Sequence, residues 1–200
     1  IMRAESDEVR THSRIIAELL NPKGIHSQGS VFLKLFFEAV LPLNDFKENF
    51  DYENAQVLVE EHIGRIDENY SEGGFIDIVI KDSKNQLVIE NKIYACDQKG
   101  QLLKYKKKYP NCKLIYLTLN GKQPSEFSYK IGNGQDLKLE DVILLCYKDV
   151  IKNWIEKCLE KTHSLPIIRE TLVQYLYLIK KLTNQTTNNK MSIAIKELIL

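Results

Sequence analysis

Three charged residues are spaced so that two neighbouring strands would bring them together. Asp77, Glu90 and Lys92 lie in two largely apolar segments, 74–81 and 86–93, which flank a turn-forming cluster at 82–85. This pattern predicts a tight antiparallel hairpin. If the turn is symmetric, Asp77 lies directly opposite Glu90, and Lys92 follows on the same face because side chains alternate along a strand.

Two opposed carboxylates in an apolar setting need compensation, since their Cβ atoms are only ~5 Å apart and like charges at that separation destabilise a sheet. A shared proton, the Lys92 ammonium or a divalent cation could supply it. Lys92 cannot pair with both carboxylates, whereas Mg²⁺ prefers oxygen ligands and keeps several waters. The pattern favours a metal site that uses Asp77 and Glu90. The alternative is a solvated hairpin face whose charges are incidental.

The segments around this hairpin predict an α/β fold, a mixed β-sheet flanked by helices, because helices and strands are interspersed along the chain. The predicted elements are helices at 4–20 and 31–41, strands at 56–63, 74–81 and 86–93, a helix at 97–109, strands at 112–119 and 142–147, and helices at 148–161 and 166–182, with irregular loops at 43–55 and 120–136.

The composition is that of one soluble globular domain. The chain has 200 residues, 44% hydrophobic and 28% charged, and a net charge of +1, so no global field indicates a nucleic-acid partner. No apolar run approaches the ~20 residues that span a bilayer, and the polar N-terminus is unlike a signal peptide. We expect a cytoplasmic protein without membrane contact. Its four scattered cysteines, which form no CxxC pair, are expected to be buried thiols.

Positive charge is concentrated in the helix predicted at 97–109. Asp97 is the only acidic residue from 97 to 113, and one face of the helix brings Gln101 and Tyr105 together. The lysines either contact phosphates or form an ordinary solvated face, and their position directly after the charged strand favours phosphate contact. The candidates for nucleic-acid binding on this helix are Lys99, Lys104, Lys107 and Lys108.

Further polar candidates precede the hairpin. The candidates for a third metal-binding carboxylate are Glu8, Glu18, Glu60 and Glu61. Glu8 is preferred because it lies one helical turn from His12, on the stripe predicted to face the sheet. His12 and His26 are candidates for phosphate contact, although a hydrogen-bonded structural histidine is the more frequent case.

Taken together, these residues resemble the PD-(D/E)xK nuclease superfamily, which has a restriction-endonuclease-like core. Gly74-Phe75-Ile76-Asp77, followed by Ile89-Glu90-Asn91-Lys92, is similar to the core signature of this superfamily. The run from Gln101 to Tyr105 resembles the QxxxY element of the RecB-type exonuclease branch. The chain also resembles an uncharacterised bacterial family of this superfamily at His12-Ser13, Leu19-Leu20-Asn21-Pro22, His26, Gly29, Phe32-Leu33, Arg169-Glu170, Gln174-Tyr175 and Lys180-Lys181-Leu182. The likeness covers about residues 5–183, with Ile76 in place of the proline usual before the aspartate.

The resemblance implies a metal-dependent nuclease that hydrolyses phosphodiester bonds and leaves a 5′-phosphate and a 3′-hydroxyl. The implied catalytic residues are Asp77, Glu90, Lys92, Gln101 and Tyr105. The implied ligands of Mg²⁺ or Mn²⁺ are Asp77, Glu90, the Asn91 carbonyl and Glu8. Lys92 would position or deprotonate the attacking water and stabilise charge on the phosphate.

Residues 1–183 are expected to form this nuclease-like domain, and 184–200 a polar linker and the start of a further helix that is cut off at Leu200. The expected partner is nucleic acid, with DNA favoured, although no residue pattern distinguishes DNA from RNA or internal cleavage from cleavage at ends. The competing function is a non-catalytic nucleic-acid-binding or interaction domain on the same fold, for example within a defence or toxin assembly. The presence of Asp77, Glu90 and Lys92 favours catalysis.

Overall fold

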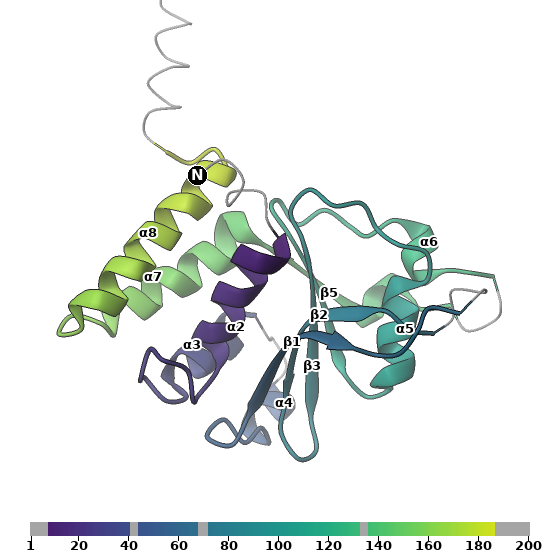
Figure 1. Cartoon of the computed structure of the whole chain (residues 1–200), viewed down its shortest axis with the longest axis horizontal. Helices are drawn as coiled ribbons and strands as arrows, with labels where there is room; N and C mark the ends of the chain where they lie inside the picture. The colour runs from purple at the N-terminus through teal and green to yellow at the C-terminus, as the bar shows by residue number, and fades with distance from the viewer. Residues whose placement is uncertain (1–7, 41–43, 68–71, 133–135, 187–200) are drawn as a thin grey trace, which may run out of the picture.

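Five strands form one mixed sheet between two groups of helices (Figure 1). The computed structural model describes residues 8–40, 44–67, 72–132 and 136–186. The strands are β1 (Gln56–His62), β2 (Phe75–Lys81), β3 (Gln86–Lys92), β4 (Lys113–Thr118) and β5 (Val142–Cys146). They lie in the order β1-β2-β3-β4-β5, antiparallel from β1 to β3 and parallel from β3 to β5.

Helices cover both faces of the sheet (Figure 1). The helical elements are η1 (Glu8–Ser13, a π-helical turn), α2 (Arg14–Leu20), α3 (Val31–Val40), α4 (Asn44–Glu48), α5 (Gln101–Lys108), α6 (Glu126–Tyr129), η2 (Leu139–Asp141, a 3₁₀ turn), η3 (Tyr147–Ile151, a π-helical turn), α7 (Lys152–Glu160) and α8 (Pro166–Leu182). On one face, α2, α3, α7 and α8 enclose a core with sheet residues such as Ile78 and Ile89. On the other, α5 packs on residues such as Val79 and Val88. The predicted mixed sheet flanked by helices is confirmed.

The connections explain the strand directions. Asp82 Oδ1 accepts hydrogen bonds from the backbone N–H groups of Lys84 and Asn85, which closes the turn between β2 and β3. Parallel neighbours need a crossover instead, and α5 supplies it between β3 and β4. The carboxyl ends of β3 and β4 therefore lie side by side, where Lys92 pairs with Thr118.

The hairpin register matches the prediction near the turn but not at the open end. Ile78 pairs with Ile89, as predicted, and the β2–β3 pairs between described residues stop there. Ile76 was predicted on the face of Ile78, yet it packs in the core on the α5 side. Glu60, which the β1–β2 register places across from Asp77, has a left-handed φ of 50°. The regular alternation is thus interrupted at Asp77, at the point where the neighbouring strand also departs from regular geometry.

Some predicted boundaries were wrong. The helix predicted from residue 97 begins only at Gln101, because Gly100 has a left-handed φ of 63° and the Asp97 carboxylate binds other side chains. The loops predicted before β1 and before β5 contain the short helices α4 and α6. Helix α4 is anchored by Phe46, which stacks on Phe37 of α3.

Three other predictions concern single residues or the chain as a whole. Cys112 and Cys158 are buried thiols, as expected, whereas Cys96 is exposed. In the part of the chain that the structure describes, no helix is long and apolar enough to cross a membrane. The helix predicted after the linker lies outside the described residues.

Candidate active site

Glu90 is a buried carboxylate near the end of β3, on the face covered by α5. Only 1% of the residue is exposed. Its Oε2 lies 2.5 Å from the hydroxyl of Tyr105, and its Oε1 lies 2.7 Å from Nζ of Lys92. Burial raises the pKa of Glu90 above its ordinary value, while Lys92 and Tyr105 act against that rise. The two carboxylate oxygens are thus held by two different elements, β3 itself and α5.

Helix α5 holds Glu90 through a short hydrogen-bonded chain. Gln101 and Tyr105 are one turn apart and share a face of the helix. The Gln101 amide donates to the Tyr105 hydroxyl over 3.1 Å, and this hydroxyl also lies 2.9 Å from the Phe75 carbonyl oxygen. Burial and the nearby carboxylates of Glu90 and Asp77 raise the pKa of Tyr105 well above its ordinary value. Tyr105 is therefore a neutral donor that orients Glu90, and both α5 residues act through that carboxylate.

Asp77 lies at the same end of the hairpin, on β2. Its Oδ2 accepts a hydrogen bond of 2.8 Å from the backbone N–H of Asn91. The sequence predicted a ladder pair with Glu90, but the strands have left regular pairing here, and the Asp77 carboxylate binds the next residue of β3 instead. The Asp77 carboxylate also contributes to the raised pKa of Tyr105, the hydroxyl that contacts Glu90.

The side chain of Asn91 points to the opposite face, into the helices. Its Nδ2 donates to Ser13 Oγ over 3.0 Å, and its Oδ1 accepts a hydrogen bond of 2.8 Å from the Tyr147 hydroxyl. Tyr147 is hydrogen-bonded in turn to Tyr175 of α8, whose hydroxyl lies 3.3 Å from Nδ1 of His12. This buried network holds the end of β3 from the helical side of the sheet opposite α5, because each buried polar group in it has a partner.

Both histidines that were predicted to contact phosphate are buried in the helical layer. His12 lies against two tyrosine rings, one from η3 and one from α8. His26 Nε2 lies 2.9 Å from the Asn21 carbonyl oxygen, and its Nδ1 accepts a hydrogen bond from the Gln28 N–H. These are the contacts of structural histidines, the alternative that the sequence left open.

The lysines of the predicted basic helix are of two kinds. Lys99, Lys107 and Lys108 are exposed. In contrast, only 3% of Lys104 is exposed, and burial lowers its pKa. Lys107 forms an ion pair with Glu72. Lys104 is therefore far more buried than Lys107 and Lys108, although all three line one hollow.

Three of the four carboxylates considered as a third metal ligand have other contacts. Glu18 accepts a hydrogen bond from a loop N–H, and Glu61 accepts one from a tyrosine hydroxyl. Glu60 lies 3.6 Å from Arg14. The side chain of the preferred candidate, Glu8, lies outside the described residues. Among the side chains that the structure does describe, no group of three or more His, Cys, Asp or Glu residues could hold a metal ion.

The oxygen atoms at the hairpin end nevertheless fit a hard divalent cation. Glu90 Oε1 is buried and, apart from the ion pair with Lys92, has no hydrogen-bond partner among the described residues. The Asp77 carboxylate and the Asn91 backbone carbonyl come from the same hairpin. Two carboxylates and a carbonyl are donors that Mg²⁺ and Mn²⁺ accept, with waters completing the coordination.

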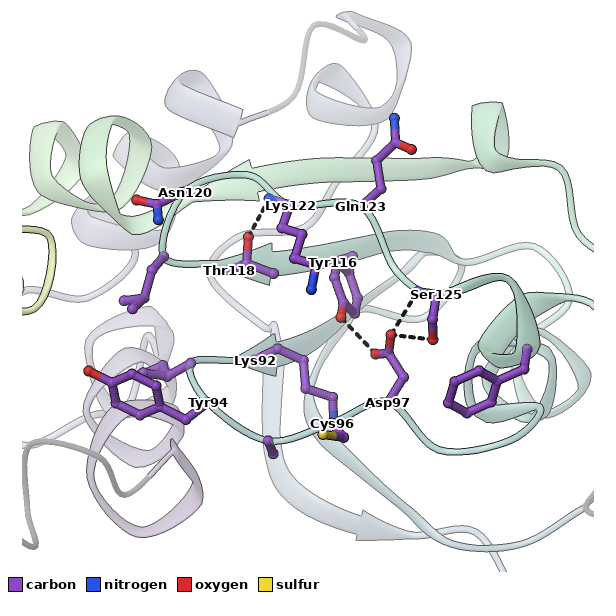
Figure 2. A pocket seen from close by; sticks show the side chains of 14 residues that line it. Lys92, Tyr94, Cys96, Asp97, Tyr116, Thr118, Asn120, Lys122, Gln123 and Ser125 are labelled. Carbon is purple, nitrogen blue, oxygen red and sulfur yellow. Dashed lines mark hydrogen bonds between the residues drawn. The ribbon is translucent and has the colours of Figure 1, made fainter.

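A hollow of about 440 Å³ opens beside Lys92, at the carboxyl ends of β3 and β4. Figure 2 shows the side chains of Lys92 and Lys122 extending into it from two sides, one from β3 and one from the loop after β4. Asp97 lies at one end, where it accepts hydrogen bonds from the Tyr116 hydroxyl and from Ser125. Burial would raise the pKa of Asp97, but these hydrogen bonds outweigh it and hold the pKa below its ordinary value.

Sequence reasoning missed most residues of this hollow. They come from segments without a periodic pattern, which were predicted as loops or as part of a helix. One general signal was available: in sheets with parallel strands, ligand sites lie beyond the carboxyl ends of the strands. Lys122 follows β4 in this position.

The chain matches the family model of the PD-(D/E)XK nuclease superfamily over residues 1–177. It belongs to this superfamily, and the mixed sheet with Asp77, Glu90 and Lys92 on one hairpin agrees with that membership. Comparison with curated proteins and with solved structures gave no significant match. Membership indicates a nuclease of a class that usually uses divalent metals, with nucleic acid as its substrate.

Proposed function

We propose that this chain is a Mg²⁺- or Mn²⁺-dependent nuclease that hydrolyses phosphodiester bonds, with DNA as the favoured substrate. The observation that supports the proposal most directly is the environment of the buried Glu90 carboxylate. Glu90 is buried, and its two carboxylate oxygens are held by the Lys92 ammonium group at 2.7 Å and by the Tyr105 hydroxyl at 2.5 Å. A buried carboxylate whose pKa is raised by burial is typical of functional sites.

In this proposal, Asp77, Glu90 and the carbonyl of Asn91 hold the metal ion, and Glu8 is the candidate for a further carboxylate. When bound, the ion supplies Lewis-acid stabilisation of charge on the phosphate oxygens. Tyr105 keeps the Glu90 carboxylate oriented and, as a hydrogen-bond donor, opposes the protonation that burial favours. The Asn91 backbone N–H does the same for one oxygen of Asp77.

We assign Lys92 to the attacking water and the phosphate. Its ammonium group is paired with Glu90 and lines the hollow, so it can orient a water and stabilise negative charge as it develops. The water gives up a proton as its oxygen forms a bond to phosphorus, the bond from phosphorus to the 3′-oxygen breaks, and that oxygen takes up a proton as it leaves. The products are a 5′-phosphate and a 3′-hydroxyl.

Cleavage assays and metal titration together test the proposal. Linear, circular and single-stranded DNA, with RNA alongside, are incubated with Mg²⁺, with Mn²⁺ or with a chelator. We expect cleavage by the wild-type protein only when metal is present, and loss of cleavage in Asp77→Asn. Titration with Mn²⁺ in a calorimeter should show binding that Asp77→Asn loses. Asp141→Asn, which changes an exposed aspartate of η2, is the matched control and should behave as wild type.

Two results would contradict the proposal. One is equal Mn²⁺ binding by wild type and Asp77→Asn, which would remove the metal site from the hairpin. The other is an absence of cleavage on every substrate by a folded protein that binds metal, which would favour a binding module on the same fold.

A further inference from the structure

The hollow beside Lys92 is lined by exposed aromatic rings as well as by cations. Tyr94 is 62% exposed and Phe127 is 48% exposed, and both line the hollow together with Lys92 and Lys122. Single exposed apolar residues are common on protein surfaces, whereas here two large exposed rings line one polar hollow. Exposed aromatic rings combined with cations are typical of surfaces that stack bases and contact phosphates.

The groups of the hollow come from separate segments that the fold brings together. Tyr94 lies between β3 and α5, Phe127 on α6, and Lys122 between β4 and α6. Figure 2 shows Tyr94 and Asn120 apart from each other on one side of the hollow, and Asp97 with the polar groups that bind it toward the other side. Base edges need groups that donate and accept hydrogen bonds, and the exposed amide of Asn120 does both.

The size and charge of the hollow suit one nucleotide. Its volume of about 440 Å³ lies within the ~300–1,000 Å³ typical of small-molecule sites. The Lys122 side chain is exposed and forms no ion pair with any residue that the structure describes. Its ammonium group is therefore available to a phosphate next to the one that Lys92 would contact.

We propose that this hollow binds an unpaired nucleotide of the strand to be cut, so that the substrate is single-stranded nucleic acid or a duplex with a base turned out of the helix. The inference rests on the proposed nuclease function and specifies its substrate class. A ring can stack on a base only if a face of that base is free, and a duplex covers both faces with neighbouring base pairs. Because every base has such a face, the site requires no particular sequence.

Binding measured without cleavage tests this inference. The full chain with Glu90→Gln is titrated against short fluorescent probes: single-stranded DNA, single-stranded RNA, a DNA duplex, and an abasic strand with the same phosphates. We expect a single strand with bases to bind more tightly than the duplex and the abasic strand. Tyr94→Ala and Phe127→Ala should each weaken binding of that strand by about 5- to 100-fold and leave abasic binding unchanged.

Two variants serve as controls. Tyr177 is 59% exposed on α8 and does not line the hollow, so Tyr177→Ala should bind as the background protein does. Tyr94→Phe keeps the ring and should also bind normally, which separates stacking from loss of the fold. A preference between the DNA and RNA strands supports the inference in either direction and identifies the sugar.

The inference is overturned if Tyr94→Ala and Phe127→Ala both bind the single strand as tightly as Tyr177→Ala does, or if duplex and abasic probes bind as tightly as the single strand. Its failure differs from failure of the nuclease proposal. If the protein binds single strands through Tyr94 but cleaves no substrate in the presence of metal, the nucleotide site is supported and the nuclease proposal is refuted. If the wild-type and Tyr94→Ala proteins both cleave duplex and single strand equally well, the nuclease proposal is supported and the nucleotide site is refuted.

Discussion

Replacing Tyr105 with phenylalanine removes one oxygen atom from the site and leaves the packed ring in place. That hydroxyl lies 2.5 Å from Glu90 Oε2 and 2.9 Å from the Phe75 carbonyl oxygen, and it accepts a hydrogen bond from Gln101. If Glu90 is a metal ligand, Tyr105 acts on metal binding only through the orientation and protonation of that carboxylate. The substitution therefore separates a positioning role from a purely structural one.

The structure indicates how large each effect should be. A hydrogen bond to a charged group contributes ~1.5–3 kcal/mol, so we expect the free energy of unfolding to fall by ~2 kcal/mol. For a chain of this length, each kcal/mol lowers the Tm by ~2–4 °C, or about 4–8 °C in total. Loss of the donor also raises the pKa of Glu90 further, because Tyr105 opposes the rise that burial causes. Disturbing a group that orients a metal ligand typically weakens metal binding by ~10–100-fold.

Tyr109→Phe is the matched control. Tyr109 follows the last turn of the same helix, and its hydroxyl lies 2.7 and 2.8 Å from the two carboxylate oxygens of Glu61, which belongs to β1. Both variants lose a hydroxyl–carboxylate hydrogen bond, so both should unfold at a lower temperature by circular dichroism. Only Tyr105→Phe should lose Mn²⁺ affinity in calorimetry, and its cleavage rate should recover as the metal concentration is raised. If Tyr105→Phe and Tyr109→Phe bind Mn²⁺ equally well, the Tyr105 hydroxyl only stabilises the fold.

Three further predictions concern groups around the site. Tyr147→Phe leaves the buried Asn91 Oδ1 without its 2.8 Å donor, so urea denaturation should show a loss of ~1–3 kcal/mol in the free energy of unfolding. The pKa of Asp97 is lowered in the folded state, so its carboxylate stabilises the fold at pH values above its ordinary pKa of 3.8. This stabilisation is lost as the pH falls through the lower pKa of the folded state. Thermal unfolding of wild type and Asp97→Asn at a series of pH values measures this loss. Lys108→Ala should flatten the plot of log affinity for nucleic acid against log salt by ~0.7–0.9, whereas Lys104→Met should leave the slope unchanged because Lys104 is buried.

Each of these predictions has a contrary result. Unchanged stability of Tyr147→Phe would show that Asn91 Oδ1 finds another donor. If the wild-type and Asp97→Asn stabilities stay equally far apart down to the most acidic pH, the Asp97 carboxylate has no lowered pKa in the folded state. Equal salt slopes for the two lysine variants would show that exposure on α5 does not determine phosphate contact.

Local sequence patterns were sufficient to predict the hairpin near its turn and the common face of Glu90 and Lys92, but not the position of Asp77 relative to Glu90. Alternation with a period of two and a turn formed by Asp82 act over a few residues, so the pairing of Ile78 with Ile89 and the placing of Glu90 and Lys92 on one face could be predicted correctly. The same reasoning failed two residues further from the turn, at Ile76. The interruption there involves the neighbouring strand, which a pattern within the hairpin does not describe.

Helix α5 likewise has one feature that the sequence predicted and one that it could not predict. Its amphipathic pattern correctly brought Gln101 and Tyr105 to one face, because that depends only on the helical repeat. The burial of Lys104 could not be predicted in this way, since it depends on how the helix is rotated against the sheet.

Contacts between distant segments are what complete the site. The Tyr105 hydroxyl reaches Glu90 across 15 positions of the chain, and Tyr147 reaches Asn91 across 56. The hollow beside Lys92 is closed by the loop after β4 because the parallel β3 and β4 end side by side. Such contacts follow no period in the sequence: they form when separate elements bury their apolar faces against one another, and the polar groups trapped between them must then find partners.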